Sequence, residues 1–205
     1  MADSVALAQV LREHEQAKRA LQQLENATDL AAAEQAWLDL LCAASRIYSK
    51  LEQAAKRSPR ATEWFSEIKQ FRRTDALLGY IHKARNTHEH TIDEITTKVQ
   101  SGSATIRFRE PYDPAKLEGK RIRIGTDRSG HVIVDEFDPE IFEVVSYARG
   151  GLVLNEIVDV RSRMRHQPPQ RHLGRVVEDQ SPLGVAALTV DYLTTLISGA
   201  REAGI

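Results

Sequence analysis

Residues 76–103 read ALLGYIHKARNTHEHTIDEITTKVQSGS, and this stretch decides the fold because a helical pattern ends within it and a strand pattern follows. Its inward-facing positions recur at helical spacing, at Leu77, Leu78, Ile81, Ala84, His88, Ile92, Ile95 and Val99. Thr74 or Asp75 is suited to cap the start of this helix, and Ser101-Gly102-Ser103 is suited to close it. Because His88 falls on the apolar face, we expect its side chain to lie in the core.

Three further helices are predicted upstream. Residues 3–26 carry apolar side chains at helical spacing, and a second helical pattern follows Thr28, which is suited to be its N-cap. The short connection at 26–28 predicts that these two helices form an antiparallel hairpin. Ser58-Pro59 then begins a third helix at about 60–72, since proline is favoured in the first turn.

Downstream of residue 103 the apolar side chains alternate with polar ones, which is typical of strands. We expect strands at 104–109, 121–124, 131–136, 142–147 and 152–165. A turn at 127–130 predicts a hairpin between the second and third of these strands, and 149–151 predicts that the last two also pair. A loop is expected at 167–170. Ser181-Pro182 begins a final amphipathic helix.

These elements predict an α+β fold with three parts. Residues 1–103 form an antiparallel helical bundle, and residues 104–178 form a small, mostly antiparallel β-sheet inserted before the C-terminal helix. Residues 179–205 form that helix, which we expect to return to the bundle because an amphipathic helix must bury its apolar face.

Charge and cysteine content narrow the classes of function. The formal net charge of −1 gives no global reason to bind nucleic acid or an anionic membrane. The single cysteine, Cys42, allows no intrachain disulfide, which fits a cytoplasmic location. The N-terminus lacks the basic region of a signal peptide, and we expect no apolar stretch long enough to cross a bilayer and no membrane partner.

The chemistry is concentrated in Arg85-Asn86-Thr87-His88-Glu89-His90. A guanidinium group pairs with phosphate oxygens through a planar fork, and an imidazole exchanges a proton near neutral pH. Together they can act on a phosphodiester without a metal. His90 and Glu94 are spaced as metal ligands, but two ligands are too few for a zinc site, so no metal and no cofactor are expected.

An Arg, a following Asn and a His four residues further on, carried by a helical bundle, resemble the HEPN superfamily of RNA- and nucleotide-binding helical domains. The resemblance covers roughly residues 1–100 and extends to the C-terminal helix, with Arg85, Asn86 and His90 matching the shortest form of the motif. One toxin branch of that superfamily has a Tyr two residues after the His, where this chain has Ile92.

The resemblance implies a metal-independent endoribonuclease of a toxin or defence system. The resemblance implies that His90 is the base for the ribose 2′-OH or orients it, that Arg85 holds the scissile phosphate, and that Asn86 fixes the geometry. Active members work as homodimers, so the expected partners are RNA, a second copy of the chain and a protein partner such as an antitoxin.

The alternative is a non-catalytic module that dimerises and regulates, or binds a nucleotide. Five positions on an ideal helix separate Arg85 and His90 by about 140°, so they converge only through distortion or through a dimer mate. Arg85 and Glu89 could equally form a surface ion pair.

A weaker phosphate-binding prediction concerns arginines that alternate along the expected strands: Arg107, Arg109, Arg121, Arg123, Arg161, Arg163 and Arg165. If the strands are neighbours, one sheet face becomes a positive surface that could follow RNA phosphates. Acids in the same block, among them Glu136, Glu156 and Asp159, favour instead a solvated face with balanced charges.

Overall fold

The computed structural model describes residues 2–90, 94–99, 103–108, 123–126, 132–136, 142–148, 151–159 and 163–205. The described helices are α1 (Ala2–Glu25), α2 (Leu30–Ala55), α3 (Pro59–Thr74), α4 (Ala76–His90) and α5 (Pro182–Glu202). The described strands all lie between α4 and α5 in the chain, so the predicted α+β class and the order of its elements are confirmed.

Local side-chain hydrogen bonds set where the helices begin. The Ser58 hydroxyl accepts from the Ala61 amide at the start of α3, and Ser181 caps α5 in the same way, each followed by a proline. Asp75 caps α4 by accepting from the Leu78 amide at 3.0 Å. The cap of α2 is Asp29 and not the predicted Thr28, because the Asp29 carboxylate reaches the Ala32 amide.

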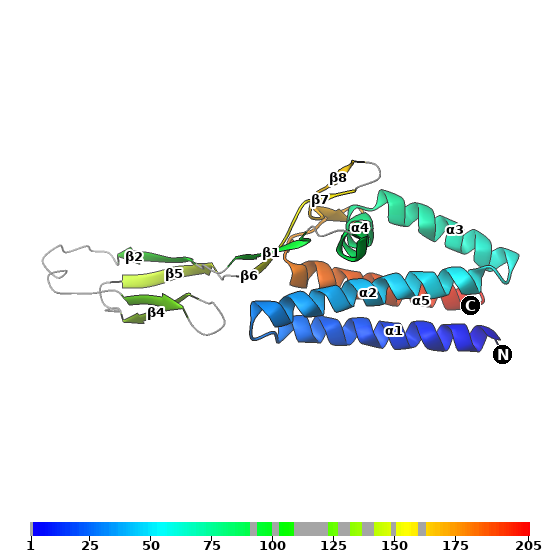
Figure 1. Cartoon of the computed structure of the whole chain (residues 1–205), viewed down its shortest axis with the longest axis horizontal. Coiled ribbons are helices and arrows are strands. Elements are labelled where there is room, and N and C mark those ends of the chain that lie inside the picture. Colours follow the sequence, from blue (N-terminus) through cyan, green and yellow to red (C-terminus); the bar gives the residue numbers. More distant parts are fainter. Residues whose placement is uncertain are drawn as a thin grey trace, which may run out of the picture.

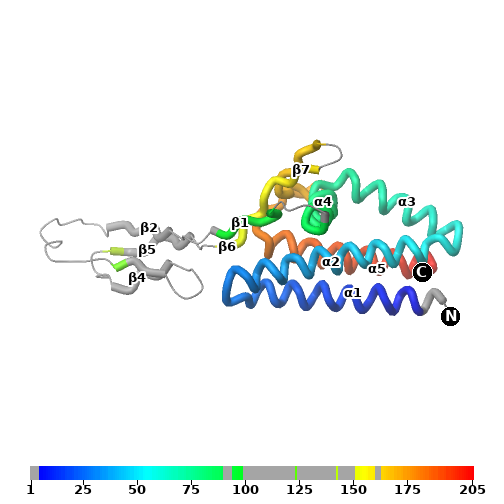
Figure 2. The backbone as a smooth tube through the Cα atoms, in the orientation of Figure 1, coloured from blue at the N-terminus to red at the C-terminus, as the bar shows by residue number. Residues whose placement is uncertain are grey.

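The helices α1, α2 and α5 run side by side, with α3 and α4 lying over them (Figure 1). The tube in Figure 2 shows α5 returning to the helices formed by the first part of the chain. The largest fully buried side chains include Trp37, Leu40, Ile47 and Leu193 from α2 and α5. One polar contact crosses this core, where the His14 Nε2 atom on α1 lies 3.0 Å from the Thr194 hydroxyl on α5.

Helix α5 is the most apolar helix of the bundle. By length and composition it could cross a membrane, so the prediction that no stretch is long and apolar enough is wrong by those two criteria. Half of that stretch is buried inside the fold, including Val185, Leu193 and Ala200. Burial against α1 and α2 is sufficient to explain the composition, since a core helix passes the same test.

The described strands form five antiparallel pairs rather than one sheet. Their bounds are β1 (Thr96–Val99), β2 (Ser103–Phe108), β3 (Arg123–Thr126), β4 (Val132–Glu136), β5 (Phe142–Ala148), β6 (Gly151–Leu154), β7 (Ile157–Val158), β8 (Arg165–His166), β9 (Arg171–His172) and β10 (Arg175–Val176). The pairs are β1 with β6, β2 with β5, β3 with β4, β7 with β8, and β9 with β10.

Three predictions about this region need correction. The β3–β4 hairpin is present, but β5 pairs with β2 and β6 pairs with β1, so the predicted β5–β6 pairing is wrong. The predicted single strand at 152–165 is divided among β6, β7 and β8. Helix α4 ends at His90 instead of continuing to Val99, because residues 96–99 are extended and pair with 151–154.

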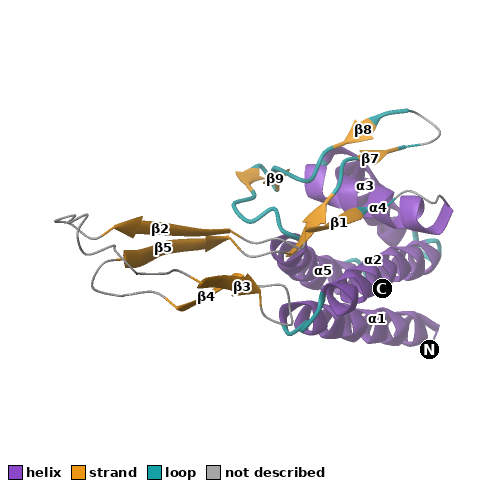
Figure 3. Cartoon of the chain, turned by 60° about the vertical axis from the view of Figure 1, so that its left-hand side comes forward, coloured by secondary structure: helices purple, strands orange, loops and turns teal. Residues whose placement is uncertain are grey.

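Figures 1 and 3 show β2, β5, β3 and β4 beyond the end of the α1–α2 hairpin, away from the helices. The shorter strands β7 to β10 stay close to α4. Three side-chain contacts hold them there: the Tyr80 hydroxyl donates to the Asn155 carbonyl at 2.8 Å, Lys83 pairs with Asp159, and His172 meets Asp75. Helix α4, which carries the motif, is therefore held from both sides.

Candidate functional site

Helix α4 places the motif at its C-terminal end. One face of the helix, with Leu77, Leu78 and Ala84, is buried in the core, and this burial fixes the direction of the opposite residues. Arg85 and Asn86 are half-buried beside that face. His88 is exposed, so the prediction that it lies in the core is wrong; Thr87 is the buried residue of this turn.

The Arg85 guanidinium is held by two neighbours on its own helix. Its Nη2 atom lies 2.5 Å from the Glu89 carboxylate, and its Nη1 atom donates to Oδ1 of Asn86 at 3.2 Å. The predicted ion pair between positions 85 and 89 is thus confirmed. The Nε atom of Arg85 is buried and has no hydrogen-bond partner among the described residues, so one donor of the fork remains unused.

Asn86 connects this pair to a histidine that the sequence analysis did not select. Its Nδ2 atom lies 3.4 Å from Nε2 of His82, one turn earlier on the same helix. Burial, followed by the charges of Arg72, Lys83 and Arg85, lowers the His82 pKa to about 4. The imidazole is therefore neutral at neutral pH, and its Nε2 atom accepts from the Asn86 Nδ2 group, which can only donate. The sequence feature that could have identified His82 is its position four residues before Asn86, on the same face of the helix.

His90 is the last residue of α4, and its side chain lies outside the described part of the structure. The helix is regular through Arg85 and His90, so these positions lie about 140° apart around its axis. The backbone shows no distortion of α4 that would bring the two positions onto one face. On a regular helix the two positions therefore do not share a face.

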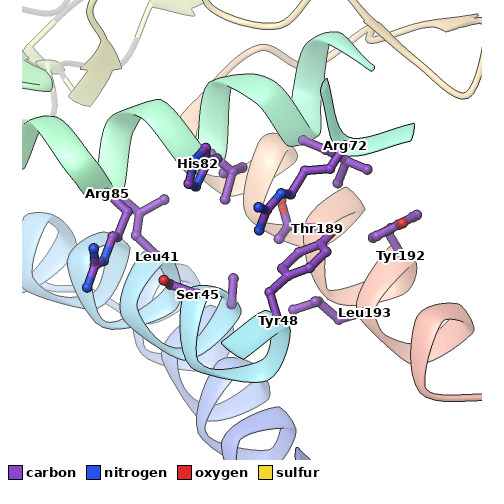
Figure 4. A pocket seen from close by; sticks show the side chains of 12 residues that line it. Leu41, Ser45, Tyr48, Arg72, His82, Arg85, Thr189, Tyr192 and Leu193 are labelled. Carbon is purple, nitrogen blue, oxygen red and sulfur yellow. The ribbon is translucent and has the colours of Figure 1, made fainter. Parts of the chain in front are cut away.

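A cavity lies beside His82, between α2, α3, α4 and α5, and is lined by Tyr48, Arg72, His82, Arg85, Thr189 and Tyr192 with several apolar side chains. Figure 4 shows the Arg72 guanidinium between the His82 ring and the Tyr48 ring, with Arg85 at the other end. The space measures about 350 Å³ including its mouth, but only about 20 Å³ of it admits the centre of a water molecule. It therefore has room for about one water molecule and not for a nucleobase.

The predicted arginine surface is divided among separate strand pairs. Arg107 in β2 is opposite Glu143, and Arg123 in β3 is opposite Glu136. Arg165 in β8 donates to the Glu156 carboxylate at 2.8 Å. Arg163 is exposed and has a φ of 56°, a left-handed conformation. Arg109, Arg121 and Arg161 lie outside the described residues.

The positions of these arginines bear on whether they form one phosphate-binding face or belong to solvated strands with balanced charges. Arg107, Arg123 and Arg165 belong to three different two-stranded pairs, so they do not share one sheet face. Of the three, Arg165 is ion-paired with Glu156, which reduces the positive potential that it presents. The division into separate pairs counts against one continuous positive face, and phosphate binding by these arginines stays a prediction.

Comparison of the chain with models of protein families, with curated proteins and with solved structures finds no match. The resemblance to the HEPN superfamily stays a prediction from the motif.

Proposed function

We propose that this chain is a HEPN-like, RNA-directed protein that cleaves RNA without a metal, as a homodimer. The observation that carries the proposal is the fixed pair of Arg85 and Asn86 on α4, one turn before His90. The Asn86 amide orients the guanidinium, as a phosphate-binding fork requires, and a histidine follows on the same helix.

The ion pair with Glu89 does not prevent such a role for Arg85. The two side chains are 27% and 34% exposed, and a pair with this much solvent contributes on the order of 1 kcal/mol or less. A phosphate carries similar charge and more acceptor atoms, so it can replace the carboxylate at low cost. In the protein without RNA, Glu89 then occupies the position of the phosphate and keeps the Arg85 side chain extended.

The reaction proposed is transfer of the phosphodiester to the neighbouring ribose oxygen. His90 takes the proton from the 2′-OH, whose oxygen attacks the adjacent phosphorus. The bond from phosphorus to the 5′-oxygen breaks, and that oxygen takes a proton from water and leaves as a 5′-hydroxyl, while His90 returns its proton to the solvent. Arg85 stabilises the charge that gathers on the non-bridging oxygens, and the other product is a 2′,3′-cyclic phosphate.

A single experiment tests the proposal. A mixed RNA pool is incubated in EDTA with the wild type, with His90→Ala and with His88→Ala, an exposed histidine two residues away that serves as the matched control. We expect cleavage to cyclic-phosphate ends by the wild type and His88→Ala, and a loss of about a hundredfold or more in His90→Ala.

Thermal unfolding of all three proteins verifies that they are folded. Equal cleavage by wild type and His90→Ala, cleavage that disappears with EDTA, or no cleavage by the folded wild type would each refute the proposal.

A further inference from the structure

Three polar side chains on one side of α4, those of His82, Asn86 and Arg85, form a continuous chain of contacts. Arg85 and Asn86 follow His82 by three and four positions, so all three are neighbours on the surface of the helix. The Nδ2 atom of Asn86 lies 3.4 Å from Nε2 of His82, and its Oδ1 atom lies 3.2 Å from Nη1 of Arg85. The Asn86 amide therefore contacts the imidazole with one end and the guanidinium with the other.

The chemistry of the guanidinium determines which way the Asn86 amide points. An arginine only donates hydrogen bonds, so the atom of Asn86 that faces Arg85 must be the carbonyl oxygen. The NH₂ group then faces His82, and because this group also only donates, the Nε2 atom of His82 must be the acceptor. An unprotonated Nε2 places the one ring proton of a neutral imidazole on Nδ1. One tautomer of His82 and one orientation of the amide thus satisfy the chain.

The surroundings of His82 favour this neutral ring. The charged groups that act on it are Arg72 on α3, Lys83 and Arg85 on its own helix, and Asp159 after β7. The three cations disfavour a further positive charge, and the one acid is already ion-paired with Lys83. Burial and these cations lower the pKa of His82 to about 4, so the ring remains an acceptor at neutral pH.

An acceptor at position 82 is what distinguishes the two possible orientations of the Asn86 amide. The oxygen and the NH₂ group of an amide have nearly the same size and shape, so a turn of 180° exchanges them with little change in packing. The turned amide presents its NH₂ group to the Arg85 guanidinium, donor against donor, and the contact that orients Arg85 is lost. The orientation of Arg85 therefore depends on His82 through Asn86.

We infer that His82 is a positioning residue for RNA cleavage, whose Nε2 atom fixes the Asn86 amide and thereby holds Arg85 in place for the scissile phosphate. The inference rests on the proposed function and extends that site one helical turn beyond the contiguous motif, toward the start of α4. A phosphate-binding guanidinium gains from such support, because a side chain that is already ordered loses less conformational entropy when the substrate binds.

The tautomer of His82 tests the hydrogen-bond chain without any RNA. NMR spectra that correlate the ring protons of histidines with their ring nitrogens are recorded at neutral pH, and the His82 signals are assigned by their absence in His82→Gln. We expect the wild type to carry the proton on Nδ1, and Asn86→Ala to shift toward the tautomer protonated on Nε2. A proton on Nε2 in the wild type, or an unchanged tautomer in Asn86→Ala, would overturn the inference, since a coupling between two groups is reciprocal.

Cleavage of a mixed RNA pool tests the effect on the proposed reaction. His82→Phe keeps a ring and removes the acceptor, and we expect kcat/KM to fall about five- to twentyfold. His82→Gln supplies a side-chain oxygen four positions before Asn86, so it should restore most of the activity. In the Asn86→Ala protein, His82→Phe should cause no further loss, because its effect passes through Asn86. His88→Phe makes the same change at an exposed position of the helix and should leave cleavage unchanged.

Melting temperatures verify that each variant is folded. Full activity in His82→Phe, equal losses in His82→Phe and His82→Gln, or a further loss from His82→Phe in the Asn86→Ala protein would each overturn the inference. No cleavage by the folded wild type would refute the proposed nuclease and this role of His82 with it. The tautomer of His82 in the wild type and in Asn86→Ala would still decide whether the hydrogen-bond chain exists, so the two failures are distinguishable.

Discussion

The Nδ1 atom of His172 lies 3.0 Å from Oδ1 of Asp75, and the two side chains are 7% and 5% exposed. This contact joins residues 97 positions apart in the sequence. The same carboxylate caps α4 through the Leu78 amide and accepts from the Leu173 amide at 2.9 Å. One buried side chain therefore begins the helix that carries the motif and ties it to the strands that precede α5.

The first prediction concerns the stability that Asp75 supplies. Replacing Asp75 with Ala removes a helix cap and leaves the Leu173 amide and His172 without their acceptor. We expect the free energy of unfolding to fall by about 2–4 kcal/mol. Asp29→Ala removes the exposed cap of α2 and is the matched control, with an expected loss of about 1 kcal/mol. Urea unfolding measures both, and equal losses would show that the buried contacts add nothing to the cap.

The second prediction concerns acid sensitivity. Burial, together with nearby cations, lowers the His82 pKa from 6.5 to about 4, and burial, together with Lys18, lowers that of His14. The fold favours the neutral form of each ring, so this stability is fully present above pH 6.5 and is lost as the pH falls from there through the folded pKa. We expect stability to decline between pH 6.5 and about 4, and to decline less steeply in His82→Gln.

The control for this pH dependence is His88→Gln, which changes an exposed histidine on the same helix. Its stability should follow the wild type across the whole range. If the unfolding free energies of the wild type and His82→Gln decline in parallel from pH 6.5 to 4, protonation of His82 does not contribute to the loss of stability.

Local signals predicted the beginnings of α3 and α5 because a cap and a following proline are adjacent in sequence, as at Ser58 and Ser181. The end of α4 was not predicted, because the helical spacing of apolar residues continues to Ile95, beyond the last residue of the helix, His90. Contacts from a distant segment decide it: the Asn155 amide donates to the Ile95 carbonyl, and its side chain donates to the Glu94 carbonyl.

The residues of the candidate site likewise include some that the sequence could identify and some that it could not. Arg85 and Asn86 were found because their motif is contiguous in sequence. Tyr48, Arg72 and Tyr192 come from three helices and approach one another only through packing, so no spacing in the sequence marks them. The observed pairing of β2 with β5 was not predicted for a related reason, since a turn rule favours strands that are neighbours in sequence.

The third prediction tests whether Glu89 restrains Arg85. Glu89→Gln keeps the size of the side chain and removes its charge, so the guanidinium loses a competitor for phosphate. We expect RNA to bind about two- to tenfold more tightly, with the free energy of unfolding changed by less than about 1 kcal/mol. Glu67→Gln, an exposed acid on α3, is the control for net charge. Equal gains in both variants would indicate a general electrostatic effect and not a specific release of Arg85.

The last prediction separates a site within one protomer from a site shared by two. Positions 85 and 90 lie about 140° apart on a regular helix, which disfavours convergence within one chain. If one protomer supplies Arg85 and its partner supplies His90, then Arg85→Ala and His90→Ala are each inactive alone. Unfolding and refolding them as a mixture forms heterodimers in which one of the two sites is intact.

We expect such a mixture to recover roughly a quarter of wild-type cleavage, because about half of the dimers are mixed and each has one complete site of two. A mixture of His90→Ala with the double variant Arg85→Ala and His90→Ala should recover nothing, since neither protein supplies the histidine. Absence of recovery in the first mixture, when each variant is folded and dimeric, would place both residues of a site in the same chain. Helix α4 would then have to depart from its regular geometry when RNA binds.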